Sequence, residues 1–265
     1  MEIKIIDYED KYIEEYSVCL EDWNNTLQGA GLLKREWMER MNGTGLRSKL
    51  ALNKEGVVGG MIEYMPVEYS FVEGSNLYFI NCIWVHGYEE GRGDFQGEGL
   101  GTELLKAAEE DVKTIGSAGI LAWGISAPFW MSAIWFEKHG YKEIDREGTR
   151  VLLIKKFSEI TFQPRWIRNQ YKQDLIPGKV RITSFINGQC MSENKVHLTA
   201  KAIADEFGED VVFEEIKTFD KSTMRYYGRK SGLFVNGRDV LRGAPLSYEE
   251  LKEIIEAEID SIKKQ

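Results

Sequence analysis

The sequence predicts an α/β protein built from two unequal domains, and three observations lead to this. The chain has 265 residues, more than one domain of about 150 residues needs. Strand-like and helix-like segments alternate over residues 1–157 and again over residues 180–262, and an irregular stretch with prolines at 164 and 177 separates them. Hydrophobic residues make up 43% and charged residues 29% of the chain, as in ordinary globular proteins. We therefore expect a domain over 1–158, a linker over 159–179 and a smaller domain over 180–265.

The first domain is expected to combine helices with a mixed sheet. The apolar run LYFINCIWVH at residues 77–86 is long and β-prone enough for a central strand. Residues 46–53 and 57–66 predict a hairpin around the turn at 54–56. A helix is expected after the Gly29-Ala30-Gly31 break. The other expected elements are strands at 2–6, 120–126, 141–144 and 150–157, and helices at 8–20, 32–41, 100–115 and 128–139.

The second domain is expected to follow the order β-α-β-α-β-β-α. Asn236-Gly237 is a strong two-residue hairpin signal between the last two strands. Ser247 and Glu250 form a capping box ahead of the final helix. The expected strands are 180–186, 211–216, 233–235 and 239–242, and the expected helices are 195–207, 219–227 and 247–262.

The most informative segment is a glycine-rich loop that connects a strand to a helix. It reads CIWVHGYEEGRGDFQGEGLGTELLK over residues 82–106. Glycines at such a turn let several N–H groups converge at a helix N-terminus, which favours phosphate binding. The Gly-Lys-Ser/Thr ending of a P-loop is absent, and the glycines do not follow the first strand of a dinucleotide-binding unit.

The paired motifs resemble those of the GNAT acetyltransferase superfamily. Gln96, Gly99 and Gly101 match its pyrophosphate loop, and residues 136–141, FEKHGY, match the end of its YEKxGF helix. The resemblance implies a sheet that splays open between residues 77–86 and 120–126, with the pantetheine arm of acetyl-CoA inserted there. Pairing of that arm with main chain would resemble strand addition, and the Val85 amide would stabilise a developing oxyanion. The implied cofactor-binding residues are Ile83, Trp84, Val85, Gln96, Gly97, Glu98, Gly99, Leu100, Gly101 and Thr102.

Two positions depart from the family pattern. Phe136 stands where many members carry the tyrosine that protonates the departing CoA thiolate, and Phe129 stands where they often carry asparagine. The resemblance therefore does not identify the residue that acts as general acid. Water, Tyr141 or Tyr78 are the alternatives, since a thiolate is a tolerable leaving group.

An alkylammonium acceptor must lose a proton before it attacks, so a base is needed. His86, at the end of the cofactor strand, is the first candidate because histidine ordinarily titrates near neutrality; the alternative is a structural histidine bonded to the loop. Glu63 in the neighbouring hairpin is the second candidate. Cys82 is expected in the core.

The acceptor pocket is expected near Glu21, Asp22 and Trp23. An aromatic face beside two carboxylates suits a cation, although core packing is the alternative role for the tryptophans of this half. Residues 1–160 carry a net charge of −10 and residues 161–265 a net charge of +1. This balance disfavours nucleic acid as a partner and is compatible with a small amine or peptide substrate.

The second domain resembles a thioredoxin-like domain. Cys190 stands where the first cysteine of the redox motif would be, Glu193 replaces the second, and Ser231 occupies the usual proline position. One thiol cannot carry out dithiol exchange within the site. The domain order resembles that of the YoaP-like acetyltransferase proteins.

These observations predict a cytoplasmic, acetyl-CoA-dependent N-acetyltransferase that acts by direct attack of a primary amine, with no metal and no membrane partner, and with a homodimer as a further option. Three scattered cysteines and three histidines give no zinc spacing. Two alternatives stay open. One is a non-catalytic acyl-CoA sensor, and the other is a monothiol thioredoxin-like protein centred on Cys190.

Overall fold

The computed structural model describes residues 3–127, 131–168, 170–241 and 246–264. The chain divides into two compact units. The first unit comprises Met1–Trp23 and Met41–Ile167, and the second comprises Asn24–Arg40 and Arg168–Gln265. This division differs from the predicted one chiefly in the segment Asn24–Arg40.

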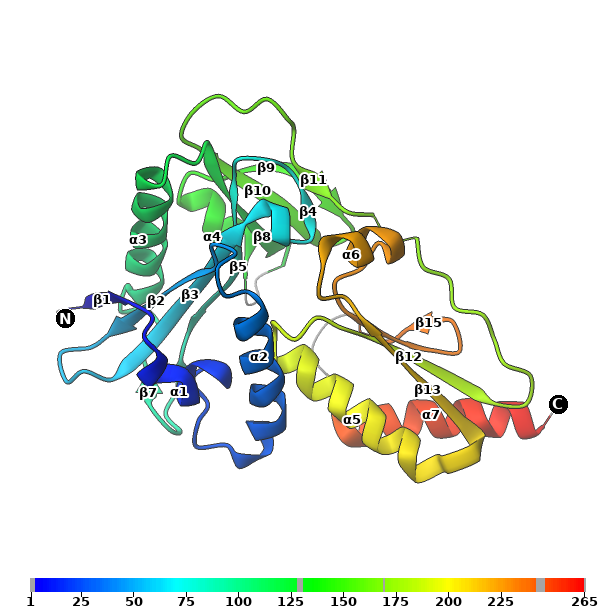
Figure 1. Ribbon diagram of the computed structural model, residues 1–265. Coiled ribbons are helices and arrows are strands. Elements are labelled where there is room, and N and C mark those ends of the chain that lie inside the picture. The colour runs from blue at the N-terminus through cyan, green and yellow to red at the C-terminus, as the bar shows by residue number, and fades with distance from the viewer. Residues whose placement is uncertain (1–2, 128–130, 169, 242–245, 265) are drawn as a thin grey trace. The chain divides into compact units, whose positions relative to one another are not determined.

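The first unit is built on a seven-stranded mixed sheet in the order β1-β2-β3-β5-β8-β10-β9 (Figure 1). Only β5 and β8 pair in parallel, and all other neighbours pair antiparallel. The predicted mixed sheet is therefore confirmed. The strands are β1 Lys4–Asp7, β2 Arg47–Leu52, β3 Val58–Pro66, β5 Tyr78–Val85, β8 Gly119–Ile125, β9 Lys142–Glu147 and β10 Arg150–Lys156.

The sheet splays between β5 and β8, as the family resemblance implied. Only Tyr78 and Phe79 of β5 have partners on β8. On its other side β5 follows β3 to its end, but Glu63 lies opposite Cys82 and Tyr64 opposite Ile80, which leaves Asn81 as the extra residue of a bulge. Because a bulge bends the strand that carries it, it accounts for the separation of β5 from β8 just beyond Phe79.

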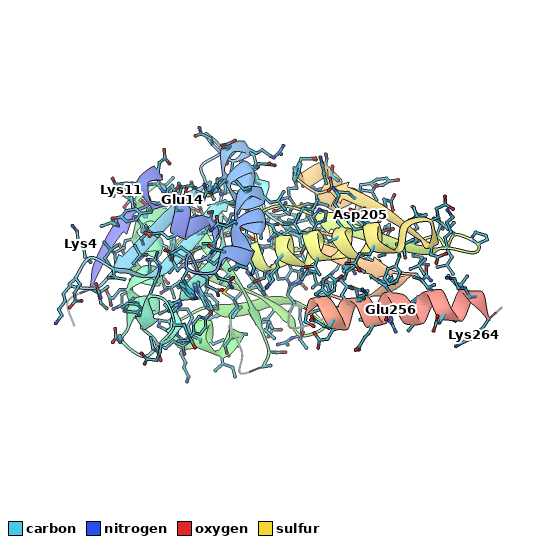
Figure 2. All side chains as sticks on the ribbon, turned by 90° about the horizontal axis from the view of Figure 1, so that it is seen from below. Lys4, Lys11, Glu14, Asp205, Glu256 and Lys264 are labelled. Carbon is cyan, nitrogen blue, oxygen red and sulfur yellow. The ribbon has the colours of Figure 1, made fainter. Side chains whose placement is uncertain are left out.

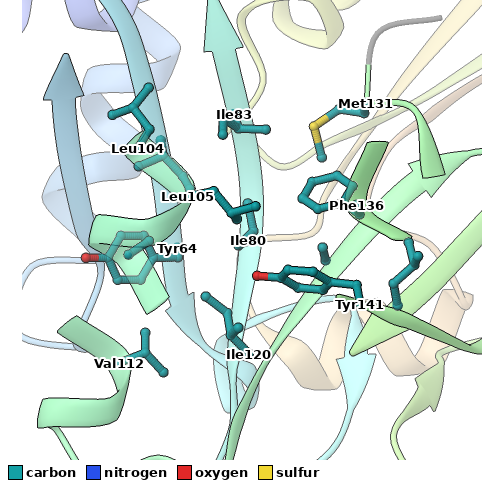
Figure 3. Close-up of a cluster of buried hydrophobic side chains, with 14 of the residues drawn as sticks. Tyr64, Ile80, Ile83, Leu104, Leu105, Val112, Ile120, Met131, Phe136 and Tyr141 are labelled. Carbon is teal, nitrogen blue, oxygen red and sulfur yellow. The ribbon is translucent and has the colours of Figure 1, made fainter. Parts of the chain in front are cut away.

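Helices cover both faces of this sheet. Helix α3, Leu100–Thr114, packs on β2, β3 and β5, and α4, Ala133–Lys138, packs on β8 and β10. Side chains alternate across a strand, so Ile62 and Tyr64 join the core under α3, while Glu63 points to the face covered by α1, Ile13–Ser17. Figure 3 shows the core under α3 and α4.

Two short strand pairs complete the first unit. The hairpin of β6, Gly87–Tyr88, and β7, Gly93–Asp94, follows β5 directly. Strand β11, Arg165–Trp166, pairs with β4, Val72–Glu73. Part of the predicted linker thus belongs to the first unit, and Trp166 is buried there against Phe79.

The second unit has a four-stranded sheet in the order β13-β12-β14-β15. Strands β12 and β13 are parallel, and β12–β14 and β14–β15 are antiparallel. The predicted β-α-β-α-β-β-α order and the Ser247–Glu250 capping box are both confirmed. The elements are β12 Val180–Ile186, α5 Met191–Phe207, β13 Val211–Lys217, α6 Lys221–Tyr227, β14 Gly232–Val235, β15 Arg238–Asp239 and α7 Tyr248–Lys263.

Helix α2, Gln28–Arg40, packs on α5 and so belongs to the second unit. The prediction that this helix begins only after Gly29-Ala30-Gly31 is wrong, because these residues lie inside it. A Cβ on Gly29 would stand 3.2 Å from Leu198 Cδ1 of α5, and Asn194 Nδ2 donates to the Ala30 carbonyl at 3.1 Å. The glycine allows the two helices to approach closely, which offsets its low helix propensity.

The predicted helix over residues 8–20 is shorter than expected. A 3-10 turn, Asp10–Tyr12, precedes α1, and the backbone turns left-handed at Cys19 and Leu20. The predicted helix over 128–139 is described only from residue 131, and its helical part is α4. Charged side chains such as Asp205 on α5 and Glu256 on α7 project outward (Figure 2). No helix among the described residues is long and apolar enough to cross a membrane.

Candidate functional site

The open edge of β5 presents main-chain groups to the gap. The His86 N–H donates to the Gly59 carbonyl of the β3 side at 3.0 Å. In an antiparallel pair the N–H and C=O of one residue point to the same side and alternate along the strand. The N–H and C=O of Val85 and of Ile83 therefore point away from β3, into the gap where β8 has diverged.

Trp123 of β8 crosses the gap at its narrow end. Its Nε1 donates to the Asn81 carbonyl at 2.8 Å, the main-chain acceptor of the bulge residue. The Asn81 carbonyl thus accepts its hydrogen bond from a side chain and not from the main chain of a neighbouring strand. This contact leaves the stretch from Ile83 to Val85 as the open part of the strand edge.

The glycine loop lies between β7 and α3, and its geometry suits an anion. Gly97 and Gly99 have φ of 77° and 91°, which favour glycine. Residues 96–99 are exposed, and nothing stands within 4 Å of a Cβ built on Gly97. The Gln96 N–H donates to Asp94 Oδ1 at 2.8 Å, which fixes the entry to the loop. The first N–H groups of α3 have no partner within their own helix and face the exposed loop.

The loop and the gap meet at Gly101. A Cβ there would stand 3.6 Å from Trp135 Cζ2 of α4 and 3.7 Å from Val85 Cγ2 of β5. The first turn of α3 therefore borders the end of the open strand edge. One ligand could therefore place an anionic group at the loop and an extended arm along β5 without a break between them.

Thr102 and His139 join α3 to α4 at this point. His139 Nδ1 lies 2.8 Å from the Trp135 carbonyl, which can only accept, so Nδ1 carries the proton. The Thr102 hydroxyl then donates to Nε2 at 3.1 Å. Thr102 was expected to bind the cofactor through its N–H, and its hydroxyl already has a partner in the chain.

The proposed general acids lie in different places. Phe136 is fully buried beside Tyr141, and Figure 3 shows the Tyr141 hydroxyl directed into the core between Ile80 and Ile120. Burial raises the pKa of Tyr141 well above its usual value, which disfavours a role as proton donor. Tyr78 lies at the paired end of β5, seven residues or about 23 Å along the strand from Val85. Phe129 lies outside the described residues.

Glu63 is fully buried on the α1 face of the sheet. Its Oε2 accepts a hydrogen bond from the Tyr16 hydroxyl at 2.7 Å, and its Oε1 accepts one from Asn81 Nδ2 at 3.2 Å. Burial, and next to it the Glu63 carboxylate, raises the pKa of Tyr16 well above its usual value. This bonding favours a structural role for Glu63, which ties α1 to the bulge that opens the sheet.

His86 occupies the end of β5, as predicted, but it is 0% exposed. Its Nδ1 lies 2.7 Å from the Gly93 carbonyl of the β6–β7 hairpin. The rings of Trp23 and Tyr88 pack edge-on against it, with centroids at 4.9 and 4.5 Å. Among the described residues, Nε2 has no hydrogen-bond partner.

The predicted acceptor residues cluster with His86, but their carboxylates are engaged. Glu21 Oε1 accepts a hydrogen bond from the Tyr88 hydroxyl at 2.7 Å. Asp22 forms an ion pair with Arg92 at 2.7 Å, and Arg92 also binds Glu15. Arg92 and Tyr88 were missed by sequence reasoning, and only their position in the glycine-rich loop marked them. Trp23 is 38% exposed and lies against the backbone of Gly91.

In the second unit, Cys190 precedes the first residue of α5 and is partly exposed. Glu193 accepts a hydrogen bond from the Ser231 hydroxyl at 2.6 Å, and Lys230 donates to Gln189 Oε1 at 2.6 Å. The three motif positions noted in the sequence, Cys190, Glu193 and Ser231, thus fall at one end of this unit's sheet. No group of three or more acidic, histidine or cysteine side chains suited to a metal occurs among the described residues.

Comparison with solved structures finds acetyltransferases that align with about 60% of this chain. A GNAT family acetyltransferase from Brucella melitensis, in complex with acetyl-CoA, is 16% identical, with a TM-score of 0.43 over 61% of this chain and 92% of its own. The PaiA N-acetyltransferase from Thermoplasma acidophilum, in complex with coenzyme A, is 16% identical, with a TM-score of 0.44 over 59% and 100%. The GNAT family N-acetyltransferase YhbS from Escherichia coli, in complex with CoA, is 16% identical, with a TM-score of 0.44 over 62% and 89%.

No protein-family model and no curated protein matches the sequence. TM-scores below 0.5 carry no conclusion about activity. We therefore base the function on the strand gap, the glycine loop and their meeting point in this chain.

Proposed function

We propose that the protein is an acyl-CoA-dependent N-acyltransferase whose cofactor site is the gap between β5 and β8. The observation that carries the proposal is the loss of β5–β8 pairing beyond Phe79, with the exposed glycine loop at the far end of the same open edge. A pantetheine arm has two amides that an open strand edge can bind. A diphosphate suits the N–H groups of a helix N-terminus.

Each part of the cofactor has a place in the chain. Ile83 and Val85 offer main-chain donors and acceptors to the pantetheine amides. The N–H groups of residues 97–102 would hold the diphosphate, and the open space at Gly97 leaves room for it. The cofactor supplies the acyl group as a thioester, and the Val85 N–H would bind the thioester carbonyl oxygen.

The acceptor class is a primary amine. The acidic balance of residues 1–160 is compatible with a cationic substrate, but the engaged carboxylates of Glu21 and Asp22 favour recognition by other groups. Phe136 has no proton to donate, Tyr141 is buried, and Tyr78 lies at the paired end of β5. We therefore assign protonation of the departing thiolate to water. The second candidate function is acyl-CoA binding without transfer. It is favoured because position 136 holds phenylalanine and not a tyrosine that could protonate the thiolate.

We propose further that the second unit is a thioredoxin-like domain of the YoaP-like kind. Its strand order and directions, with the paired Glu193 and Ser231 near Cys190, support this. Because Glu193 replaces the second cysteine, the domain is expected to lack dithiol–disulfide exchange.

The first test is a thermal-unfolding series of the full chain with acetyl-CoA, with CoA and without ligand. Ligand at 100 times its Kd stabilises the native state by about 2.7 kcal/mol, so a Tm increase of a few degrees is expected. Gly101→Glu should abolish this increase, because the new side chain fills the meeting point of loop and gap and repels a diphosphate. Gly101 lacks a left-handed φ, so the substitution does not strain the backbone.

The matched control is Thr114→Glu, which adds the same charge at the exposed far end of α3. It should keep the ligand-induced increase. An equal loss in both variants, or no increase with the unmodified protein, contradicts the proposed cofactor site. Release of CoA thiol upon addition of amines then separates transfer from binding alone.

A further inference from the structure

The cluster around His86 contains two buried polar atoms for which the described residues provide no hydrogen-bond partner. They are His86 Nε2 and Trp84 Nε1, and neither has a hydrogen-bond partner among the residues that the structure describes. A buried polar atom without a partner destabilises the folded state, and such atoms in a native structure call for a functional or solvent explanation. The two atoms belong to residues only two positions apart. We therefore take them to mark one site, in which a ligand supplies the missing hydrogen-bond partners.

The two atoms lie on the same face of the same strand. Side chains two residues apart share a face of a strand. Ile83 and Val85 point to the α3 core, so Trp84 and His86 point to the opposite face. Both of their rings pack near Tyr88, with centroids at 6.4 Å for Trp84 and 4.5 Å for His86.

The proton on His86 can be assigned from its partner. The Gly93 carbonyl can only accept, so Nδ1, 2.7 Å away, donates and carries the proton. In the neutral ring, Nε2 is then the acceptor nitrogen. The main chain fixes it in place, because the His86 N–H donates to Gly59 at 3.0 Å and its carbonyl accepts from the Phe95 N–H at 2.9 Å.

Trp84 Nε1, the other buried atom without a partner among the described residues, is a hydrogen-bond donor. The Trp84 indole N–H can only donate. A ligand that satisfies both atoms must therefore present an N–H donor to His86 and an oxygen acceptor to Trp84. The Val85 N–H, assigned to the thioester carbonyl, lies between these two residues in the chain.

We propose that Trp84 and His86 form the acceptor subsite, that His86 Nε2 takes the proton of the acceptor amine, and that the acceptor is a primary amine with a neighbouring carboxylate or carbonyl. This rests on the proposed function and names its substrate class. An α-amino acid or amino-acid amide has this pattern. The rings of Trp23, Trp84 and Tyr88 favour an apolar side chain on that substrate.

The chemical step balances with His86 as base. One proton of the acceptor ammonium moves to Nε2, and the freed nitrogen lone pair forms the C–N bond to the acyl carbon. The C–S bond breaks, and its electron pair leaves on sulfur. The second proton of the attacking nitrogen passes to water as the thiolate takes a proton from water, and the imidazolium returns its proton to solvent. The products are an amide, a thiol and one proton.

Access requires movement of one ring. Trp23 and Tyr88 are each 38% exposed and both contact the buried His86. Tyr88 is held by its hydrogen bond to Glu21. We therefore assign access to Trp23, which rests on the Gly91 backbone.

The test uses the full chain and two probes. The chain has three histidines, so the imidazole ¹⁵N spectrum contains few signals, and loss of one set in His86→Asn assigns His86. In the free protein we expect Nδ1 protonated and Nε2 unprotonated. Addition of L-leucine or leucinamide at saturating acetyl-CoA should shift the Nε2 signal. A proton on Nε2 in the free protein, or no shift with either probe, overturns the proposal.

Kinetics supply the second measurement. His86→Asn keeps a donor near the Nδ1 position and removes Nε2, so kcat should fall by about 100-fold or more, while the Tm increase with CoA stays. Trp84→Phe removes only the indole N–H. It should raise KM for L-leucine about tenfold or more beyond any change in KM for isoamylamine, which lacks the carboxylate.

The outcomes separate the two levels of the proposal. Absence of a Tm increase with acetyl-CoA in the unmodified protein rejects the cofactor site itself. If acetyl-CoA binds but kcat of His86→Asn equals that of the unmodified protein, only the role of His86 falls. If Trp84→Phe changes KM equally for L-leucine and isoamylamine, the acceptor class is wrong.

Discussion

At the scale of single residues, the carboxylate of Glu63 is fully buried and depends on hydrogen-bond donors from other elements. Its Oε2 accepts from the Tyr16 hydroxyl at 2.7 Å, and that hydroxyl also lies 2.7 Å from Ser48 Oγ. Hydrogen bonds to charged groups contribute about 1.5–3 kcal/mol.

Tyr16→Phe should therefore lower the free energy of unfolding by about 1.5–3 kcal/mol, because the carboxylate loses a donor while it stays buried. Urea denaturation measures the change. Tyr69→Phe is the matched control on an exposed tyrosine and should stay within about 0.5 kcal/mol. Equal effects of the two substitutions would show that the Glu63 contact does not carry the stability.

Residue types and spacing predicted the position of the loop residues but not the pairing of side chains. Gln96, Gly99 and Gly101 were identified through the resemblance of the loop to a family motif, and Gly99 does adopt a left-handed φ that favours glycine. The Tyr88–Glu21 contact joins residues 67 positions apart, and no local pattern encodes it. The burial of His86 was equally invisible, because it depends on Trp23 from another segment.

At the scale of elements, the start of α7 is set by a capping box. Ser247 Oγ accepts from the Glu250 N–H at 3.1 Å, and the Glu250 carboxylate accepts from the Ser247 N–H at 2.8 Å. Both satisfy N–H groups that a helix start otherwise leaves open.

Ser247→Ala should lower stability by about 1 kcal/mol. Ser261→Ala is the matched control, since the same substitution in the exposed last turns of α7 removes no cap. Thermal unfolding followed by circular dichroism measures both. A loss of stability in Ser261→Ala as large as that in Ser247→Ala would contradict the assigned cap.

Long or strongly patterned elements were predictable, and short ones were not. The hairpin β2–β3 and the strand β5 follow from alternation and from a continuous apolar run. The pair β4–β11 consists of two residues on each strand, too few to form a pattern. The start of α2 was missed because glycine disfavours helix locally, while close packing on α5 decides the outcome.

At the scale of the whole molecule, buried tyrosines make the free energy of unfolding depend on pH in the alkaline range. Burial is the first cause that raises the pKa values of Tyr16, Tyr64 and Tyr141 above 10. These groups keep their protons in the folded state at a pH where the unfolded chain loses them. Their contribution is complete below pH 10 and is lost as the pH rises above it.

The Tm should therefore fall steeply above about pH 10. Tyr64→Phe removes one of the three groups and should make the fall shallower, while its Tm at neutral pH also drops because the hydrogen bond to Asp111 is lost. Scanning calorimetry between pH 8 and 11.5 measures both slopes. Parallel curves for the two proteins would contradict the assignment to buried tyrosines.

The placement of α2 in the second unit has a consequence for synthesis on the ribosome. Ala30 and its partner Asn194 are 164 residues apart, so at about 5–20 residues per second α2 emerges roughly 10–30 s before the helix that receives it. During that interval its glycine-lined face has no native neighbour. The first unit can complete its sheet meanwhile, but the second cannot close until nearly the whole chain has been translated. Once residues 41–167 have left the ribosome, the sheet of the first unit can be complete while α2 still lacks its partner α5.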